Sequence, residues 1–157
     1  MSSTGVRIKR PPKPGAKKRK RAGYITGNHV SPKCATPIEY RSSWELEVCL
    51  FLDYSDDVEA YAYEAIAITY STGRNKTKIK RYFPDFFVKY KDGRKVIIEV
   101  KREDKLNNLV VRNKAEAARA WGVQNGFEYE FWTDVLIKRL KVINQARKAA
   151  RNGKDDK

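Results

Sequence analysis

The chain of 157 residues is long enough for one domain with a hydrophobic core, and its formal net charge is +15. This excess of Lys and Arg favours a polyanionic partner, most simply nucleic acid. No apolar run reaches the roughly 18 residues that a membrane span needs, and two cysteines are too few for a disulfide framework. The composition therefore excludes a membrane protein and a disulfide-rich secreted one, and we expect a cytoplasmic setting.

Residues 1–36 are predicted to form a basic arm that is disordered when free. They are rich in Pro, Gly, Lys and Arg, and the first acidic residue of the chain is Glu39. The densest cluster consists of Lys17, Lys18, Arg19, Lys20 and Arg21. Such a cluster is a nuclear address, a solubilising tail or a contact to DNA phosphates, and its charge density favours the phosphate contact.

The folded domain is expected at residues 37–150, with a polar tail at 151–157. The predicted elements are a helix over 42–52, strands over 58–63 and 65–70, a polar turn over 71–77, strand-like runs over 81–90 and 94–101, a loop over 104–108, a helix over 109–125 capped by Gly126, a strand over 127–132 and an amphipathic helix after Thr133. Leu136, Leu140 and Ile143 are expected on the inner face of this last helix. The order of elements indicates an α/β fold, with a mixed β-sheet flanked by helices.

Two interpretations of Glu45 stay open. Ser42 and Glu45 have the spacing of a capping box, in which the Glu side chain bonds back to the N-cap amide. Glu45 also shares an apolar helix face with Val48 and Leu52, where a carboxylate needs a metal, a water or a lysine as its partner. We expect a functional role for Glu45, which need not exclude capping; Glu47 and Glu64 are weaker candidates.

The two strand-like runs are predicted to form a hairpin through the loop Lys91, Asp92 and Gly93. Three-residue loops commonly end with a glycine in the left-handed region, so Tyr90 should pair with Arg94. Continued along the strands, this register places Asp85 opposite Glu99, with Cβ atoms about 5 Å apart.

The other face of this hairpin supports the same register. Its apolar residues would be Pro84, Phe86 and Val88 on the first run and Val96, Ile98 and Val100 on the second. A two-residue loop would instead pair Asp85 with Val100 and would mix the acidic and apolar faces. The three-residue loop is therefore the better interpretation.

Asp85 and Glu99 predict a site for a divalent metal ion. Two carboxylates this close repel each other unless positive charge lies between them, and Mg²⁺ prefers a few carboxylate oxygens together with water and phosphate. Lys101 returns to the same face as Glu99 and can contact a phosphate or a water near the metal. A solvated face is the alternative, but Phe87 and Ile97 on this face favour a half-buried site.

Glu45, the Pro84-Asp85 pair and the Glu99-x-Lys101 triplet resemble the PD-(D/E)xK nuclease superfamily. The strings over 40–45 and 81–86 look more narrowly like the TnsA-type endonuclease branch, and within it most like the head completion nucleases of T-even-type tailed phages. The resemblance covers about residues 37–134 and implies a restriction-endonuclease-like fold. The arm and the last helix lie outside it.

The resemblance implies roles for these residues. Asp85 and Glu99 would bind Mg²⁺ or Mn²⁺, Lys101 would activate the attacking water, and Glu45 would complete the site through a metal-bound water or a second ion. Arg112 and Lys114, on the helix after the site, either contact the scissile DNA strand or belong to a solvated face.

The leading hypothesis is a Mg²⁺-dependent DNA endonuclease that hydrolyses phosphodiester bonds in phage DNA packaging or head completion. One alternative is a DNA-binding structural head-completion protein with an idle nuclease site. Another is a transposase-type endonuclease subunit that is active only within a complex. Phage head or packaging proteins are then expected partners, a homodimer would supply two active sites for cutting both strands, and a phage-encoded chain would act in the host cytoplasm.

Overall fold

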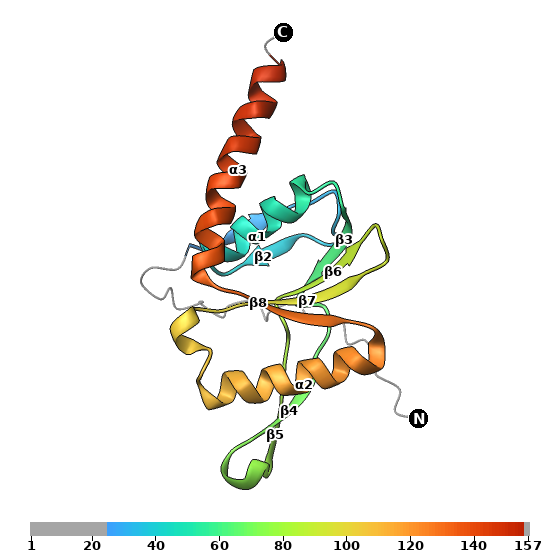
Figure 1. Cartoon of the computed structure of the whole chain (residues 1–157), viewed down its shortest axis with the longest axis vertical. Helices are drawn as coiled ribbons and strands as arrows, with labels where there is room; N and C mark the ends of the chain where they lie inside the picture. The colour runs from blue at the N-terminus through green and yellow to red at the C-terminus, as the bar shows by residue number, and fades with distance from the viewer. Residues whose placement is uncertain (1–24, 156–157) are drawn as a thin grey trace, which may run out of the picture.

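The computed structural model describes residues 25–155, which form a mixed β-sheet with helices on both faces (Figure 1). The elements are β1 (Gly27–His29), β2 (Ile38–Tyr40), α1 (Ser43–Tyr54), β3 (Val58–Tyr63), β4 (Ile68–Thr72), β5 (Lys78–Tyr82), β6 (Phe86–Tyr90), β7 (Lys95–Val100), α2 (Leu109–Asn125), β8 (Glu128–Trp132) and α3 (Asp134–Asp155). The predicted α/β class is confirmed. Within the described range, no helix has the length and apolar character needed to cross a membrane.

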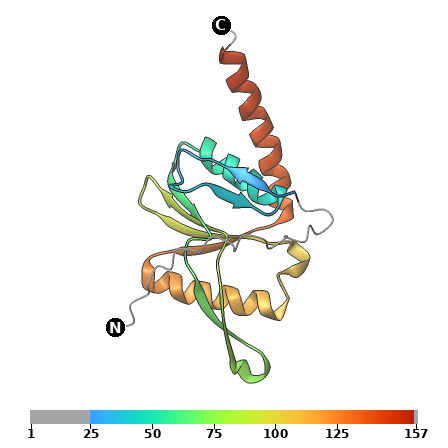
Figure 2. The ribbon, with the colours of Figure 1, turned by 180° about the vertical axis from the view of Figure 1, so that it is seen from behind.

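Four strands form the central sheet in the order β3-β6-β7-β8. β6 is antiparallel to both β3 and β7, whereas β7 and β8 run parallel. A parallel pair needs a crossover connection, and α2 supplies it. α2 lies on one face of the sheet, and α1 and α3 lie on the other, as both views show (Figures 1 and 2).

The β6–β7 hairpin has the register that its loop predicts. The Tyr90 amide donates to the Arg94 carbonyl over 2.8 Å, and Gly93 adopts a φ of 91°, in the left-handed region. The ladder pairs Phe86 with Ile98 and continues with the same register to the turn. Alternate residues of the two strands therefore face opposite sides of the sheet, as expected.

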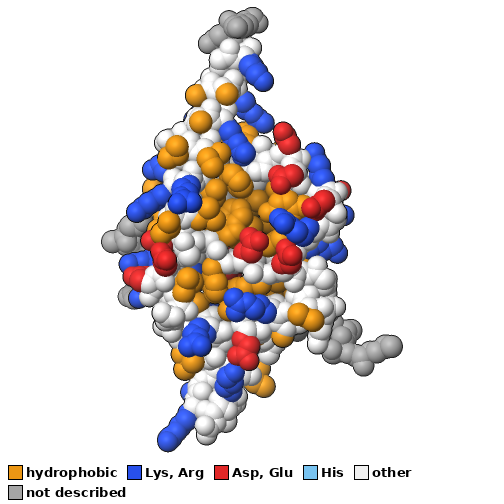
Figure 3. All heavy atoms as spheres, viewed as in Figure 1, with side chains coloured by type: hydrophobic (Ala, Val, Ile, Leu, Met, Phe, Trp, Pro, Cys, Tyr) orange, Lys and Arg blue, Asp and Glu red, His pale blue; other side chains and the backbone are white. Residues whose placement is uncertain are grey.

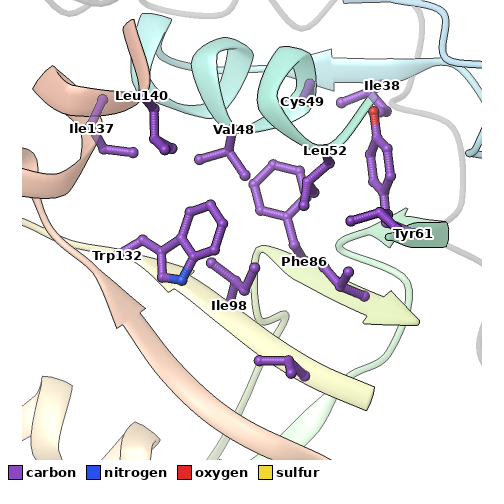
Figure 4. Packing of buried hydrophobic residues seen from close by; sticks show 13 residues of the cluster. Ile38, Val48, Cys49, Leu52, Tyr61, Phe86, Ile98, Trp132, Ile137 and Leu140 are labelled. Carbon is purple, nitrogen blue, oxygen red and sulfur yellow. The ribbon is translucent and has the colours of Figure 1, made fainter. Parts of the chain in front are cut away.

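The sheet face toward α1 and α3 is the larger hydrophobic core. Phe86 and Ile98 point toward Val48 and Leu52 of α1, and Trp132 lies beneath α3 (Figure 4). Burial of each large side chain of this kind contributes about 1.5–3 kcal/mol. This face fixes α1 and α3 against the sheet.

The face toward α2 holds a smaller cluster. Phe87 and Ile97 are buried there against Ala118, and the Phe87 ring meets Trp121 edge to face with centroids 5.6 Å apart. The predicted bounds of α2 are confirmed, with Asn108 as its N-cap and Gly126 at a φ of 77° after its last turn.

The strand-like run over 81–90 is not one strand, contrary to the prediction. It divides into β5 and β6 around Pro84, which has no N–H with which to continue a ladder. β5 pairs with β4 instead and forms a separate two-stranded unit, here named the β4–β5 ribbon (residues 68–82). The strand predicted at 65–70 is accordingly Ile68–Thr72 and lies outside the central sheet.

The folded part begins before the predicted boundary at residue 37. β1 pairs with β2, and the Lys33 ammonium donates to the carbonyls of Leu52 and Ser55 over 3.0 and 2.6 Å at the end of α1. Because these contacts are polar, the sequence of this segment has no apolar pattern that would have predicted a folded structure. Residues 1–24, with the cluster Lys17–Arg21, lie outside the described residues.

The inner face of α3 also differs from the prediction at one position. Leu140 is buried as expected, but Ile143 is 39% exposed, whereas Ile137 and Asn144 are buried. The buried positions follow a spacing of three and four residues that includes a polar side chain. Asn144 is accepted there because its amide donates to the Glu47 carbonyl over 2.9 Å.

Candidate active site

Asp85 lies where the β6–β7 ladder ends, and its carboxylate completes that ladder. The Tyr90 amide donates to the Arg94 carbonyl, and in an antiparallel ladder such hydrogen-bonded pairs alternate with pairs that are not bonded. Continued along the register, the hydrogen-bonded pair at the strand end would be Pro84 with Val100. The Val100 amide donates instead to Asp85 Oδ2 over 2.7 Å. This bond fixes the Asp85 side chain at the end of β7, beside Glu99.

Glu99 is a buried carboxylate on the α2 face of the sheet. It is 9% exposed, and its Oε2 atom has no hydrogen-bond partner among the described residues. Burial raises the pKa of Glu99 to about 7, although the positive charges of Lys101 and Lys114 and a hydrogen bond from the Asp85 backbone act in the opposite direction. An acceptor atom buried without a donor is costly unless a cation or a proton occupies that side.

Asp85 and Glu99 act on each other as like charges. Burial raises the pKa of Asp85 well above its usual range, and the negative charges of Glu99 and then Glu45 raise it further. The bond from Val100 opposes this rise without cancelling it. The structure therefore brings together the carboxylate pair that the sequence predicts.

Two lysines from different elements supply positive charge near Glu99. Lys101 follows the end of β7, where its amide donates to the Trp132 carbonyl over 3.2 Å. Lys114 comes from α2, and its ammonium lies 5.3 Å from the Tyr82 ring centroid and 5.6 Å from that of Tyr70. Both ammonium groups lower the pKa of Glu99.

Arg112 lies apart from Lys114 although both are on α2. Its side chain is exposed and lines a pocket of about 480 Å³. Phe131 of β8, the partner of Glu99 in the parallel ladder, lines the same pocket, as does Lys76 from the β4–β5 ribbon. The pocket therefore lies on the α2 side of the sheet, next to the ladder partner of Glu99.

The capping-box interpretation of Glu45 is confirmed for the Ser42 side chain, whereas the Glu45 side chain accepts from the amide one residue before the N-cap rather than from the N-cap amide itself. The Glu45 amide donates to Ser42 Oγ over 3.2 Å, and the Arg41 amide donates back to Glu45 Oε2 over 2.7 Å. The Tyr63 hydroxyl donates to the same oxygen over 2.9 Å. Glu45 lies close enough to raise the pKa of Asp85, so its carboxylate borders the pair while serving as a cap.

Glu64 is closer to the site than the sequence indicated. It is buried, its φ is 45°, and its amide donates to the Asp85 carbonyl over 2.9 Å. Its carboxylate forms an ion pair with Arg41. The only signal in the sequence was an acidic residue at the end of a strand, because the pairing with Arg41 spans 23 residues of chain.

The donor set at Asp85 and Glu99 fits a divalent cation that keeps other ligands of its own. Within residues 25–155, no group of three or more His, Cys, Asp or Glu side chains is arranged to hold a metal ion. Mg²⁺ requires no such group, because it binds through one or two carboxylates and retains water or phosphate oxygens. The unpartnered Glu99 Oε2 and the raised pKa values of both carboxylates are what such a cation would relieve.

Comparison with known proteins identifies a family for this fold. The model of the TnsA-like endonuclease N-terminal domain matches residues 55–151, a range that includes Asp85, Glu99 and Lys101 and begins after Glu45. No curated protein matches the chain. The family match spans more than half of the sequence, and the chain therefore belongs to the TnsA-like endonuclease family of nucleases.

Proposed function

We propose that this protein is a divalent-metal-dependent DNA endonuclease that hydrolyses phosphodiester bonds at Asp85, Glu99 and Lys101. The observation that carries the proposal is the pair of like-charged carboxylates held at the end of one hairpin, with Glu99 Oε2 lacking a partner among the described residues. A pair maintained against its own repulsion is typical of a functional site rather than a structural one.

Asp85 and Glu99 would hold Mg²⁺ or Mn²⁺. When bound, the cation supplies the positive charge that activates a water molecule and neutralises the charge developing on the phosphate. The bond from the Val100 amide orients Asp85 for this purpose, and the sheet around Glu99 keeps bulk water away. Glu45 borders the pair as a third carboxylate, held by Arg41 and Tyr63.

Lys101 is the basic member of the site. Its position after β7 places an ammonium group beside Glu99, where it would orient the attacking water and stabilise negative charge on the phosphate. Lys114, held over the Tyr70 and Tyr82 rings, adds a second positive charge from the α2 side. Arg112 lines the pocket on the α2 side and would contact the phosphate backbone.

Plasmid cleavage tests the proposal directly. Supercoiled DNA is incubated with the full-length protein and Mg²⁺ or Mn²⁺, beside Asp85→Asn and the matched control Asp92→Asn in the hairpin loop. We expect nicking by the wild type and the control, and a reduction of about 10²-fold or more in Asp85→Asn. Equal cleavage by all three proteins would refute the proposed site.

We place the biological role in phage DNA packaging or head completion, on the strings over 40–45 and 81–86. The family match supports a second candidate, a transposase-type endonuclease subunit that cuts only within a complex. The plasmid assay separates the two, because cleavage by the isolated protein requires no partner. A head-completion protein with an idle site would bind DNA yet cut it with neither metal.

The basic N-terminal arm is proposed to add affinity for DNA. The truncation that tests it removes residues 1–24 only, because Ser31 and Lys33 are bonded to α1 and belong to the fold. We expect weaker binding and a shallower dependence of affinity on salt in the truncated protein. An unchanged salt slope would assign the arm another role.

A further inference from the structure

The β4–β5 ribbon extends away from the rest of the molecule. Its two strands project past α2 in both views, and every residue from 73 to 81 is exposed (Figures 1 and 2). The turn between the strands is nevertheless held by its own bonds, from the Lys76 amide to the Gly73 carbonyl over 3.1 Å and from Thr77 Oγ1 to the Arg74 carbonyl over 3.0 Å. The ribbon is therefore an ordered projection rather than a buried part of the sheet.

The ribbon is strongly basic. Residues 65–84 contain no Asp or Glu, and their basic residues are Arg74, Lys76, Lys78, Lys80 and Arg81. Lys76 forms an ion pair with Glu116 of α2 over 2.9 Å, whereas the other four cations have no salt bridge to any described residue. Lys and Arg side chains are visible at the projecting end in the space-filling view (Figure 3). Charge complementarity therefore favours a polyanionic partner for this ribbon.

The two faces of the ribbon differ. Ile68, Tyr70 and Tyr82 form its inner face and pack in the cluster beneath α2. The outer face carries the cross-strand pairs Thr69 with Arg81 and Ser71 with Ile79. Ile79 is 72% exposed, an uncommon position for a large apolar side chain among cations. Hydroxyl, guanidinium and branched apolar groups are the side chains that read base edges and thymine methyl groups.

We propose that the β4–β5 ribbon enters the major groove of duplex DNA and positions the duplex for the carboxylate pair. The major groove of B-form DNA admits a two-stranded β-ribbon, and strands of this length span about 17 Å, enough to reach into it. Lys78 and Lys80 pair with Thr72 and Tyr70 and so start from the inner face, but both are exposed, and their long side chains extend, like that of Arg74, to phosphates on the groove walls. The outer face with Arg81 and Ile79 lies toward the bases. This inference rests on the proposed nuclease function and names the element that binds its substrate.

The ribbon is continuous with the candidate active site. β5 ends at Tyr82, and three residues later the chain reaches Asp85. The pocket of about 480 Å³ extends from the ribbon toward this site, because Lys76 of the ribbon and Phe131, the ladder partner of Glu99, both line it. A duplex gripped by the ribbon would therefore have its backbone near the carboxylates, with Arg112 between them.

The test measures binding by the full-length protein in EDTA, where no cleavage occurs. The ribbon variant is Lys78→Gln/Lys80→Gln/Arg81→Gln, and the control Lys89→Gln/Lys91→Gln/Lys95→Gln removes the same charge at the far end of the β6–β7 hairpin. We expect the ribbon variant to bind a DNA duplex about tenfold or more weakly, with a salt slope smaller by about 0.9 for each phosphate that it no longer neutralises. The control should stay within about twofold of the wild type.

An RNA duplex of the same sequence distinguishes groove entry from general attraction. The major groove of A-form RNA is deep and narrow and does not admit the ribbon. The ribbon substitutions should therefore weaken binding to RNA much less than binding to DNA. Equal reductions on the two duplexes, or equal reductions in the ribbon variant and the control, would overturn the proposal.

Ile79→Ser provides a second variant that leaves the charge unchanged. It should weaken binding to the DNA duplex several-fold without altering the salt slope, because the interaction that it removes is apolar. Unchanged affinity would place Ile79 outside the groove and contradict the proposal. Since binding is measured without metal, a failure of the cleavage assay leaves this result interpretable, and a failure of ribbon binding leaves the carboxylate site standing.

Discussion

The two faces of the central sheet are built from alternating residues of the same strands, yet they differ in what they bury. Toward α1 and α3, Phe86 and Ile98 pack in a continuous apolar core. Toward α2, the next residue after Ile98 is Glu99, and three buried polar atoms, Glu99 Oε2, Trp121 Nε1 and Tyr129 Oη, have no hydrogen-bond partner in the described part of the chain. The face toward α1 and α3 stabilises the fold through apolar packing, whereas the face toward α2 buries charged and unpartnered polar groups, which lowers stability.

This contrast explains how a small domain can maintain a pair of repelling carboxylates. The strain of the pair is confined to the strand ends on the α2 face, while the opposite face holds the backbone in register. Proteins commonly accept such local instability at functional sites. This comparison can be tested with matched substitutions, because one strand carries residues that point to opposite faces of the sheet and residues that lie at its opposite ends.

The largest effect is expected at Lys101, which follows β7, in comparison with Lys95, which begins that strand on the same face. Lys101→Ala should lower the cleavage rate by about 10²- to 10⁴-fold, because it removes charge beside the reacting phosphate. Lys95→Ala, at the other end of the strand, should leave the rate close to that of the wild type. Initial rates of plasmid nicking measure both, and similar reductions in the two variants would remove Lys101 from the site.

Next in size is the difference between neighbouring residues of β7 on opposite faces. Ile98→Ala should reduce the free energy of unfolding by about 2–5 kcal/mol, because it opens a cavity in a fully buried core. Glu99→Gln in metal-free buffer should instead raise it by about 1 kcal/mol, since it relieves the repulsion from Asp85.

Urea unfolding of both variants without divalent metal provides the measurement. A marked decrease of stability in Glu99→Gln would mean that the carboxylate contributes to the fold. The contrast between the faces would then be wrong.

A smaller effect on stability distinguishes the capping role of Ser42 from the proposed catalytic role of Glu45 at the start of α1. Ser42→Ala should cost about 1 kcal/mol, because the Glu45 amide loses its acceptor, while cleavage is retained. Glu45→Gln keeps an oxygen that can accept from the Arg41 amide and the Tyr63 hydroxyl. It should therefore lower the cleavage rate markedly and leave the melting temperature nearly unchanged. Normal cleavage together with a large decrease of stability would make Glu45 purely a cap.

Local rules were sufficient for the parts of the fold that local geometry determines. The three-residue loop gave the hairpin register, and the helical pattern with its Gly126 cap gave the bounds of α2. Asp85 and Glu99 could be paired from sequence because the turn determines which residues lie opposite each other. The Glu45 capping box followed from spacing alone.

Other features depend on interactions between distant segments and were not predictable. Polar bonds hold residues 27–36 against α1, so no apolar pattern indicated them. β5 leaves the central sheet at Pro84, whereas strand propensity continues across that position. Lys114 acts on Glu99 from α2, with its ammonium over the Tyr70 and Tyr82 rings of the ribbon, a contact between segments far apart in the sequence.

Calorimetric titration with Mn²⁺ tests the central claim most directly. The claim is that the α2 face carries its unfavourable carboxylate pair in order to bind a divalent cation. We predict that the wild type and Glu59→Gln, which alters an exposed carboxylate of β3, bind Mn²⁺ equally, and that Glu99→Gln loses this binding. Equal binding by all three proteins, or no binding by the wild type, would contradict the account.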